Sequence, residues 1–490
     1  MILLSLLAVP LAGGVAAFVV RSDAWRRRLL ACAAILHTAL TLAAWRIVPA
    51  PVLGEWLVLD RLGLFFLTIT SLLFLACAVY GLHYLRTESA GRQEDAEESF
   101  LFVNAPEARF TGCLLLFLAA MTLVLATRHL AILWIGIEAT TLASAPLIYF
   151  HRHHRSLEAT WKYLLICSVG IALALLGIFF LALSASVESG ASIPLTVDHF
   201  VGHAASLNGR WMKAAFLCFL VGYGTKMGLA PMHTWLPDAH SEAPSMVSAL
   251  LSGALLNCAM VGILRLLPIY DAAGYAAFCQ SLLVKFGLFS MLVAAVFIIA
   301  QRDFKRMLAY SSVEHMGILA LGIGIGGLAK WGAVLHAVNH SLAKAMMFLL
   351  AGNILRIYKT KTIAEVKGML RRAPVTAALW TAGFLAIAGA PPFGIFLSEF
   401  IILRGMFQGG HFWAGGAYLL LLSVIFVGMA GAVTSMTQGE SCCEGDRVKE
   451  PFLSFAPSLV FAVFLLITGL WIPPFLQNAV EQASRIVGVF

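Results

Sequence analysis

The chain has 490 residues, of which 60% are hydrophobic and 12% are charged, and its 33 Lys and Arg against 25 Asp and Glu give a formal net charge of +8. Soluble domains have about 45–50% apolar and about 25% charged residues. The composition therefore excludes a soluble enzyme, a disordered chain and a nucleic-acid-binding protein, and it indicates a multi-pass membrane protein with basic loops.

Continuous apolar runs recur along the whole chain, most of them close to the roughly 20 residues that a helix needs to cross the hydrocarbon layer. Because the apolar residues are continuous rather than alternating, we expect helices and not the strands of a barrel. The sequence predicts about fourteen spans, near residues 1–20, 29–48, 62–85, 110–126, 130–150, 160–186, 212–232, 244–268, 280–300, 306–328, 331–355, 375–408, 415–436 and 453–475.

Basic residues are unevenly distributed among the loops. Arg26, Arg27 and Arg28 follow the first span, and the loop after the eleventh span, residues 356–372, contains six Lys and Arg. Loops that follow odd-numbered spans hold most of the basic residues. Because Lys and Arg are retained in the cytoplasm, the sequence predicts that these loops are cytoplasmic and that both termini lie on the extracytoplasmic side of a bacterial or archaeal cell membrane.

Ionisable residues interrupt several of the apolar runs, and a charge near the bilayer centre costs about 2.5–3.5 kcal/mol on insertion scales. One such residue alone is equally well explained by a salt bridge that locks two helices together. A set of both signs on five different helices favours a proton or ion pathway instead. These residues are Glu138, Lys226, Glu314, His315, His336, His340, Lys344 and Glu399.

His336, His340 and Lys344 follow one another at intervals of four residues. Each is displaced by about 40° around the helix and about 6 Å along it, so the three form one polar stripe. Histidine titrates near neutrality, which favours a proton relay. Two metal ligands are the alternative, but no Glu follows His336 as in a zinc-protease helix, and the sequence shows no third ligand. We therefore expect no metal site.

Prolines lie close to two of the charged residues. Lys226 precedes Pro231 by five residues, and Glu399 follows Pro391 and Pro392 by eight and seven. Proline removes a backbone donor and frees a carbonyl, which is tolerated at membrane depth only where protein or water covers the break. The sequence predicts two broken helices, each carrying an ionisable residue.

The two proline-containing segments also resemble each other. Residues 228–238 align without gaps with residues 389–399, an offset of 161 residues that leaves room for the five-helix unit of an inverted-repeat transporter. The matched pairs are Gly228 with Gly389, Pro231 with Pro392, Leu236 with Leu397, and Asp238 with Glu399.

Four longer motifs resemble a known family. They are KMGLAPMHTWLPDAHSEAPSMVSALLSGALLNCAMVGILR, YSSVEHMGI, HAVNHSLAKAMMFLLAGNI and GAPPFGIFLSEF. They are similar to the antiporter-like subunits of respiratory complex I, the Mrp-type sodium/proton antiporters and the membrane arms of group 4 nickel–iron hydrogenases. Glu314 most resembles component F of hydrogenase 4, because the complex I relatives carry a small polar residue at that position.

The resemblance implies an all-α polytopic membrane protein of about fourteen helices, with two inverted five-helix repeats and two broken helices. It divides the chain into N-terminal helices over 1–109, a first repeat over 110–268, a second repeat over 280–436 and a C-terminal loop with the last helix over 437–490.

The resemblance also implies a role for each charged residue. Glu138 and Lys226 would be the pair of the first half-channel, Lys344 with His340 the central link, and Glu399 the end of the second half. Asn257 stands where the M-type complex I subunit has a lysine, so transfer between the halves would pass through water ordered by Asn257, or the halves would be separate. The auxiliary residues are His233, Asp238, Asn257, Glu314, which would compensate for Asn257, and His315.

The sequence has no cluster ligands, nucleotide loop or flavin motif, so we expect no cofactor and no catalytic centre in this chain. The energy source would lie in partners: other antiporter-like subunits and a cytoplasmic redox module, with a nickel–iron hydrogenase favoured. Loops 88–98 and 356–372 are the candidate contacts, and solvated faces are the equally weighted alternative for both loops. The predicted function is a proton-translocating subunit of a hydrogenase-4 or formate-hydrogenlyase type complex. The alternatives are a sodium/proton antiporter subunit, an M- or N-type NADH-quinone oxidoreductase subunit, and a non-pumping membrane scaffold.

Overall fold

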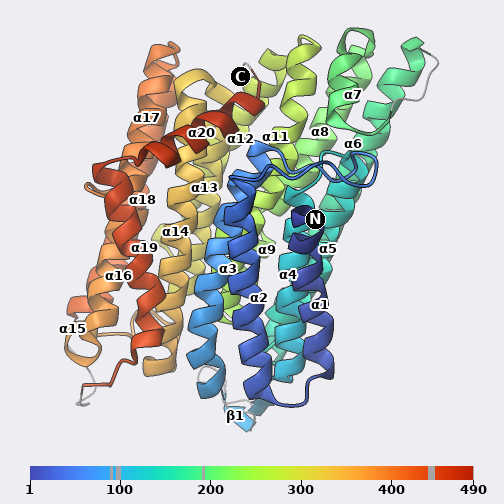
Figure 1. Ribbon diagram of the computed structural model, residues 1–490. Helices are drawn as coiled ribbons and strands as arrows, with labels where there is room; N and C mark the ends of the chain where they lie inside the picture. Colours follow the sequence, from blue (N-terminus) through green and yellow to red (C-terminus); the bar gives the residue numbers. More distant parts are fainter. Residues whose placement is uncertain (89–91, 95–100, 190–193, 440–446, 489–490) are drawn as a thin grey trace.

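The protein is described here by a computed structural model covering residues 1–88, 92–94, 101–189, 194–439 and 447–488. Figure 1 shows a bundle of long helices that run in roughly the same direction, with the short helix α20 lying across one end. The helices are α1 (Ile2–Val19), α2 (Asp23–Ala44), α3 (Arg61–Thr87), α4 (Glu107–Leu125), α5 (Leu130–Ile148), α6 (His154–Ser189), α7 (Val197–Gly202), α8 (Gly209–Met227), α9 (Trp235–Glu242), α10 (Ser245–Leu250), α11 (Leu256–Ala272), α12 (Ala276–Ile299), α13 (Phe304–Ile325), α14 (Gly327–Tyr358), α15 (Met369–Arg372), α16 (Pro374–Ile387), α17 (Gly394–Gln408), α18 (Phe412–Gln438), α19 (Phe452–Leu470) and α20 (Pro474–Ile486).

The expectation of an all-α polytopic membrane protein is confirmed. Among the described residues, twelve helices are long and apolar enough to cross a membrane, with α10 and α11 forming one of them through a π-helical turn at Leu251–Leu255. The other two expected spans fall on the interrupted segments, α8 followed by α9 and α16 followed by α17. The count of fourteen therefore depends on treating each interrupted pair as one span.

The most deeply buried helices lie at the centre of the bundle. In the most apolar 18-residue stretch of the span from Ser245 to Ala272 every residue is buried. In the corresponding stretches of α14 and α13, 94% and 89% of the residues are buried. The corresponding shares in α1, α18 and α19 are 33%, 28% and 33%. Polar side chains on the central helices are therefore covered by protein and not by lipid, which is the condition under which they are tolerated.

Both predicted helix breaks are present. The chain leaves α8 at Gly228 (φ +84°) and α16 near Gly389 (φ +64°), and both glycines lie in the left-handed region that L side chains avoid. The Ala230–Pro231 and Pro391–Pro392 bonds are cis. Each interrupted segment is the fourth in a run of five spans, α4 to α11 and α12 to α18. We propose that these two runs are the repeats expected over 110–268 and 280–436.

Polar loops gather at one end of the bundle. In Figure 1 the short helix α15 and the β-hairpin of β1 (Arg92–Glu94) and β2 (Leu101–Val103) both lie at the lower end, opposite α20. The basic loop 356–372 therefore lies at the same end as the loop between α3 and α4. Most of the acidic run expected at 88–98 lies outside the described residues.

A buried ion pair joins the N-terminal helices to the centre of the fold. Asp60 caps α3 by accepting from the Gly63 amide at 2.7 Å, and Arg265 of α11 donates to both of its carboxylate oxygens at 2.8 and 3.2 Å. Burial would raise the pKa of Asp60, but the charge and hydrogen bonds of Arg265 outweigh that effect and hold the pKa below its usual value. The stability from this pair is present above about pH 4 and is lost as the pH falls through the lowered pKa.

We expect Arg265→Met to lower the free energy of unfolding by about 3 kcal/mol, because it leaves the buried Asp60 carboxylate with only the more distant Arg128, whose Nε lies 3.8 Å away. Thermal or denaturant unfolding of the purified protein measures the change. Arg210→Met is the matched control, since Arg210 is an exposed arginine at the start of α8. Equal stability of the two variants would contradict this account of the ion pair.

Candidate functional site

Lys226 lies in the last turn of α8, fully buried, just before the helix break. Its ammonium donates to Thr141 Oγ1 at 2.8 Å and to Tyr163 Oη at 2.6 Å, and it lies 4.3 Å from the centre of the Tyr163 ring. A cation at the C-terminus of a helix is also favoured by the helix dipole. The break at Gly228 therefore places an ammonium group in a small polar pocket between α5, α6 and α8.

Glu138 lies on α5, one turn before Thr141, and is only half-buried. Its carboxylate accepts from Ser168 Oγ at 2.8 Å, and Thr141 Oγ1 lies 3.4 Å from its other oxygen. Glu138 and Lys226 are thus joined through the Thr141 hydroxyl and not by a direct ion pair. The structure brings the predicted pair together with one hydroxyl between them.

Asn257 lies at the boundary between the two halves of the bundle. Its amide nitrogen donates to Ser341 Oγ of α14 at 2.8 Å and to Gly253 O at 3.0 Å, while its buried Oδ1 has no hydrogen-bond partner among the described residues. The π-helical turn at Leu251–Leu255 lies one turn before it, and such turns are frequent at functional sites. Asn257 thus connects α11 to the polar stripe of α14.

The predicted stripe on α14 is fully buried and faces α13. The Lys344 ammonium donates to the Leu308 carbonyl of α13 at 2.7 Å. Neither ring nitrogen of His340 has a hydrogen-bond partner among the described residues, and its ring lies 4.9 Å from that of His315. Glu314 of α13 is close enough to interact electrostatically with Lys344. The sequence singled out Glu314 and His315 as auxiliary residues, and the structure places both on α13, facing the stripe.

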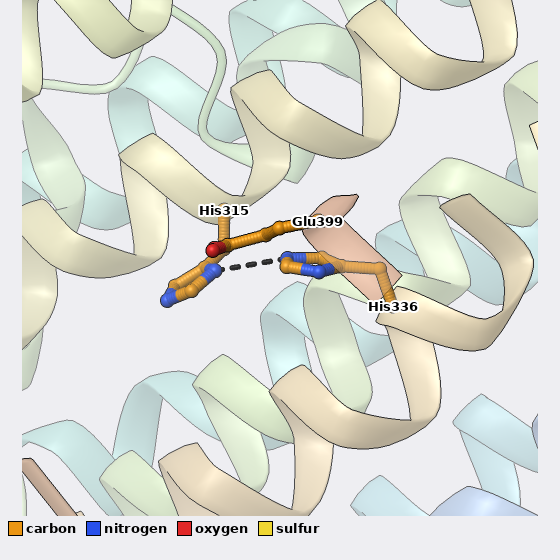
Figure 2. Close-up of side chains that lie close together, drawn as sticks. All are labelled: His315, His336 and Glu399. Carbon is orange, nitrogen blue, oxygen red and sulfur yellow. Dashed lines mark hydrogen bonds between the residues drawn. The ribbon is translucent and has the colours of Figure 1, made fainter. Parts of the chain in front are cut away.

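The stripe ends at three residues from three helices, shown in Figure 2. His315 Nδ1 of α13 and His336 Nε2 of α14 are hydrogen-bonded at 2.9 Å, and the other nitrogen of His336 lies 2.9 Å from Ser398 Oγ. The Glu399 carboxylate of α17 lies beside the two rings, and its Oε1 has no hydrogen-bond partner among the described residues. The sequence showed no third ligand to accompany His336 and His340. The fold places two further candidate ligands, His315 and Glu399, beside His336.

Two of the predicted auxiliary residues lie away from this line. Asp238 forms ion pairs with Lys162 at 3.0 Å and Arg306 at 2.8 Å, and the side chains of both cations are substantially exposed. His233 lies in the break after α8, with its ring 6.0 Å from that of Tyr310. The two aligned residues therefore have different environments: Asp238 forms ion pairs near the surface, whereas Glu399 is buried.

The sequence reasoning missed several residues that complete the site. Thr141, Tyr163 and Ser168 are uncharged, so hydropathy did not distinguish them from ordinary packing residues. His240 is fully buried with neither nitrogen hydrogen-bonded among the described residues. Lys305 is also buried and donates to the carbonyls of Ser241 and Ala243. His240 lies inside the long family motif, and this position could have identified it as a candidate functional residue from the sequence.

An open pocket of about 410 Å³ reaches Lys305 from the end of the bundle that carries the basic loop. Its lining includes Glu242, which pairs with Lys361 at 2.8 Å, together with Arg356 and Lys359. His240 lies close enough to interact electrostatically with both Lys305 and Lys344. Polar groups therefore extend from this pocket towards the buried stripe.

We expect Gly389→Ala to destabilise the protein more than Gly410→Ala. Both glycines have positive φ, so each substitution costs about 1–2 kcal/mol of backbone energy. A Cβ at Gly389 would lie 2.0 Å from Glu399 Oε2, whereas nothing lies within 4 Å at Gly410, so displacing the carboxyl should add about 1–3 kcal/mol. Thermal unfolding of the two purified variants measures the difference, and equal losses would show that Glu399 is not held against Gly389.

Known proteins with similar sequences were found across most of the chain. The family described as NADH:quinone oxidoreductase/Mrp antiporter, TM, matches residues 127–426. The chain is 35% identical over 448 residues to a Hydrogenase-4 component F homolog of Methylacidiphilum infernorum (isolate V4), with 89% of each chain covered. It is 28% identical over 451 residues to NADH-quinone oxidoreductase subunit N of Desulforudis audaxviator (strain MP104C), covering 88% of this chain and 85% of the relative.

Solved structures also match in fold. A chain of the membrane-bound sulfane sulfur reductase, an archaeal respiratory membrane complex, superposes with a TM-score of 0.88 and 21% sequence identity, covering 99% of this chain and 97% of the other. At this identity the likeness shows that the two chains share a fold.

Proposed function

The chain belongs to the NADH:quinone oxidoreductase/Mrp antiporter family, and on that premise we propose that it translocates protons as the membrane subunit of a hydrogenase-4 or formate-hydrogenlyase type complex. It is a multi-pass, antiporter-like membrane subunit, and similar chains are named as components of multi-subunit complexes. The 35% identity to a hydrogenase-4 component F homolog supports the hydrogenase assignment over an N-type NADH-quinone oxidoreductase subunit.

One observation carries the proposal: buried ionisable groups follow one another through the centre of the bundle. Thr141 links Glu138 to Lys226 on one side. On the other side a line of contacts runs from His340 through His315 to His336, and the Glu399 carboxyl lies beside the last two rings. Asn257 joins α11 to α14 between these groups. Hydroxyls, imidazoles and carboxyls at such spacing are the groups that pass protons.

The arrangement of Glu138 suggests how a partner drives the first step. Lys226 is fully buried, and the Glu138 carboxylate stabilises its charged form through Thr141. Glu138 is only half-buried, so a neighbouring subunit can contact it. When a partner draws the carboxylate away, the buried ammonium loses its counter-charge and releases its proton to water that Asn257 orders, since the amide itself cannot carry a proton. Each loss of about 1.4 kcal/mol in stabilisation lowers the ratio of protonated to neutral lysine about tenfold.

The pocket at Lys305 is the proposed entrance on the cytoplasmic side. It opens beside the basic loop 356–372, which the positive-inside rule assigns to the cytoplasm. His240 is close enough to interact electrostatically with both Lys305 and Lys344, so in this proposal a proton from water reaches the α14 stripe through Lys305 and His240. The same loop is the proposed contact for a redox module that contains a nickel–iron hydrogenase.

A non-pumping scaffold does not account for the central groups. Charges that serve only to lock helices together are paired, as Asp60 is with Arg265. Glu399 is instead buried with no ion-pair partner among the described residues. A buried carboxyl group without a paired cation favours a role in proton transfer over a role in locking helices together.

Sodium/proton antiport is the second candidate, because the matching family includes Mrp antiporters. Measuring proton uptake by proteoliposomes with and without sodium distinguishes the two. Proton flux that is independent of sodium supports the first proposal, and strict sodium dependence supports the second.

We expect Lys226→Gln to reduce proton translocation by about tenfold or more, because an amide cannot exchange a proton and Glu138 loses its partner. Proteoliposomes containing the whole complex report proton flux and the electron transfer of the redox module in the same sample. Lys213→Gln is the matched control, since Lys213 is an exposed lysine of the same helix. Unchanged pumping in Lys226→Gln would refute the assignment.

The connection between the halves is tested at Asn257. Asn257→Leu removes the amide that contacts Ser341, so we expect proton flux to fall while Lys226 and Lys344 remain in place. Asn257→Asp is nearly isosteric, keeps a polar side chain and introduces an ionisable group, so it should preserve most of the flux. Full flux in Asn257→Leu would mean that protons do not cross between the halves at this residue.

A further inference from the structure

His315, His336 and Glu399 form a compact group of potential metal ligands. They come from α13, α14 and α17, and one ligand atom from each lies within 4.8 Å of the other two. The histidines are fully buried and Glu399 is 6% exposed. Figure 2 shows the two rings and the carboxyl directed towards one another.

The hydrogen bonds of the group leave coordinating lone pairs available. His336 Nδ1 lies 2.9 Å from Ser398 Oγ, a contact that would orient the ring and support coordination through Nε2. The buried Oε1 of Glu399 has no hydrogen-bond partner among the described residues. This carboxylate and the two facing ring nitrogens, His315 Nδ1 and His336 Nε2, provide the donors that a metal requires.

The spacing is close to that of a coordinated ion. With metal–nitrogen distances of about 2.0–2.1 Å, two ligands of a tetrahedral zinc ion lie about 3.3 Å apart. His315 Nδ1 and His336 Nε2 are 2.9 Å apart while they share a proton. Transfer of that proton to the other nitrogen of its own ring and a separation of about 0.4 Å, which small rotations of the rings provide, would admit the ion between them.

We propose that His315, His336 and Glu399 bind a divalent transition-metal ion of the zinc type. Two imidazoles and a carboxylate are a ligand set of three-ligand zinc sites, whereas Mg²⁺ and Ca²⁺ prefer all-oxygen sites. The fourth position is taken by water or by His340, whose nitrogens have no hydrogen-bond partners among the described residues. On binding, the proton between the rings moves to the outward nitrogen of the imidazole that carries it, so both histidines coordinate as neutral ligands. Glu399 coordinates as the carboxylate, and a proton held by its carboxyl group is released to solvent.

The site is tested by zinc binding to the purified complex that contains the full chain. Equilibrium dialysis against Zn²⁺ gives the number of ions bound by wild type, His336→Gln, Glu399→Gln and His37→Gln. We expect the two site variants each to bind one ion fewer than wild type. His37→Gln is the matched control, because His37 is equally buried but bonded to Thr122 and Ser71 away from the site, and it should bind as wild type does. Equal numbers in all four proteins would overturn the proposal.

A second measurement needs no folded variant. Co²⁺ added to the wild-type complex should give the intense visible bands of a four- or five-coordinate ion, in addition to the weak spectrum of surface-bound, six-coordinate ions. If Co²⁺ gave only the weak spectrum of six-coordinate ions, the proposed site would be contradicted. Thermal unfolding shows whether each variant is folded before its zinc content is compared.

Block of proton flux by bound metal is a consequence that rests on the proposed function. If Zn²⁺ binds at His336 and Glu399 and the line of residues carries protons, stoichiometric Zn²⁺ should inhibit flux in wild type and in His37→Gln. Binding without inhibition would leave the metal site intact and would count against the proposed proton route. The two proposals therefore fail separately.

Discussion

The central constraint on this fold is that ammonium groups at membrane depth must be stabilised and shielded from lipid. Lys226 and Lys344 are both fully buried, and a bare charge at the bilayer centre costs at least about 2.5–3.5 kcal/mol. Each lysine is stabilised by oxygen atoms: hydroxyls of Thr141 and Tyr163 for Lys226, and a backbone carbonyl for Lys344. The central helices carry these groups because the outer helices shield them from lipid.

The helix breaks follow from the same constraint. A break frees backbone polar groups, so it persists only where protein covers it. The two breaks lie beside Lys226 and Glu399. Each break must be shielded from lipid by surrounding protein, and each also positions an ionisable side chain. At Gly389 the absence of a side chain leaves room for the Glu399 carboxyl, since any Cβ would collide with it. Interrupted helices and buried charges are therefore parts of one arrangement.

The contacts of the two halves differ in a way that bears on mechanism. Around Lys226 the nitrogen has two hydroxyl acceptors, and the Glu138 carboxylate is reached through one of them. At the other end, imidazoles contact each other directly and leave polar atoms without hydrogen-bond partners in the part of the chain that the structure describes. The first arrangement stabilises a charge, whereas the second offers open donor and acceptor sites to a proton or a metal ion.

The sequence by itself determined the membrane class, the helical runs, both helix breaks and the stripe of His336, His340 and Lys344. These are local properties, set by the length of apolar runs, by proline and by the helical period of 3.6 residues. Only the tertiary structure decided that a hydroxyl group separates Glu138 from Lys226, and that Asp238 forms ion pairs with exposed cations near the surface. It alone placed His315 and Glu399 beside His336, because contacts between α13, α14 and α17 depend on packing that local periodicity does not encode.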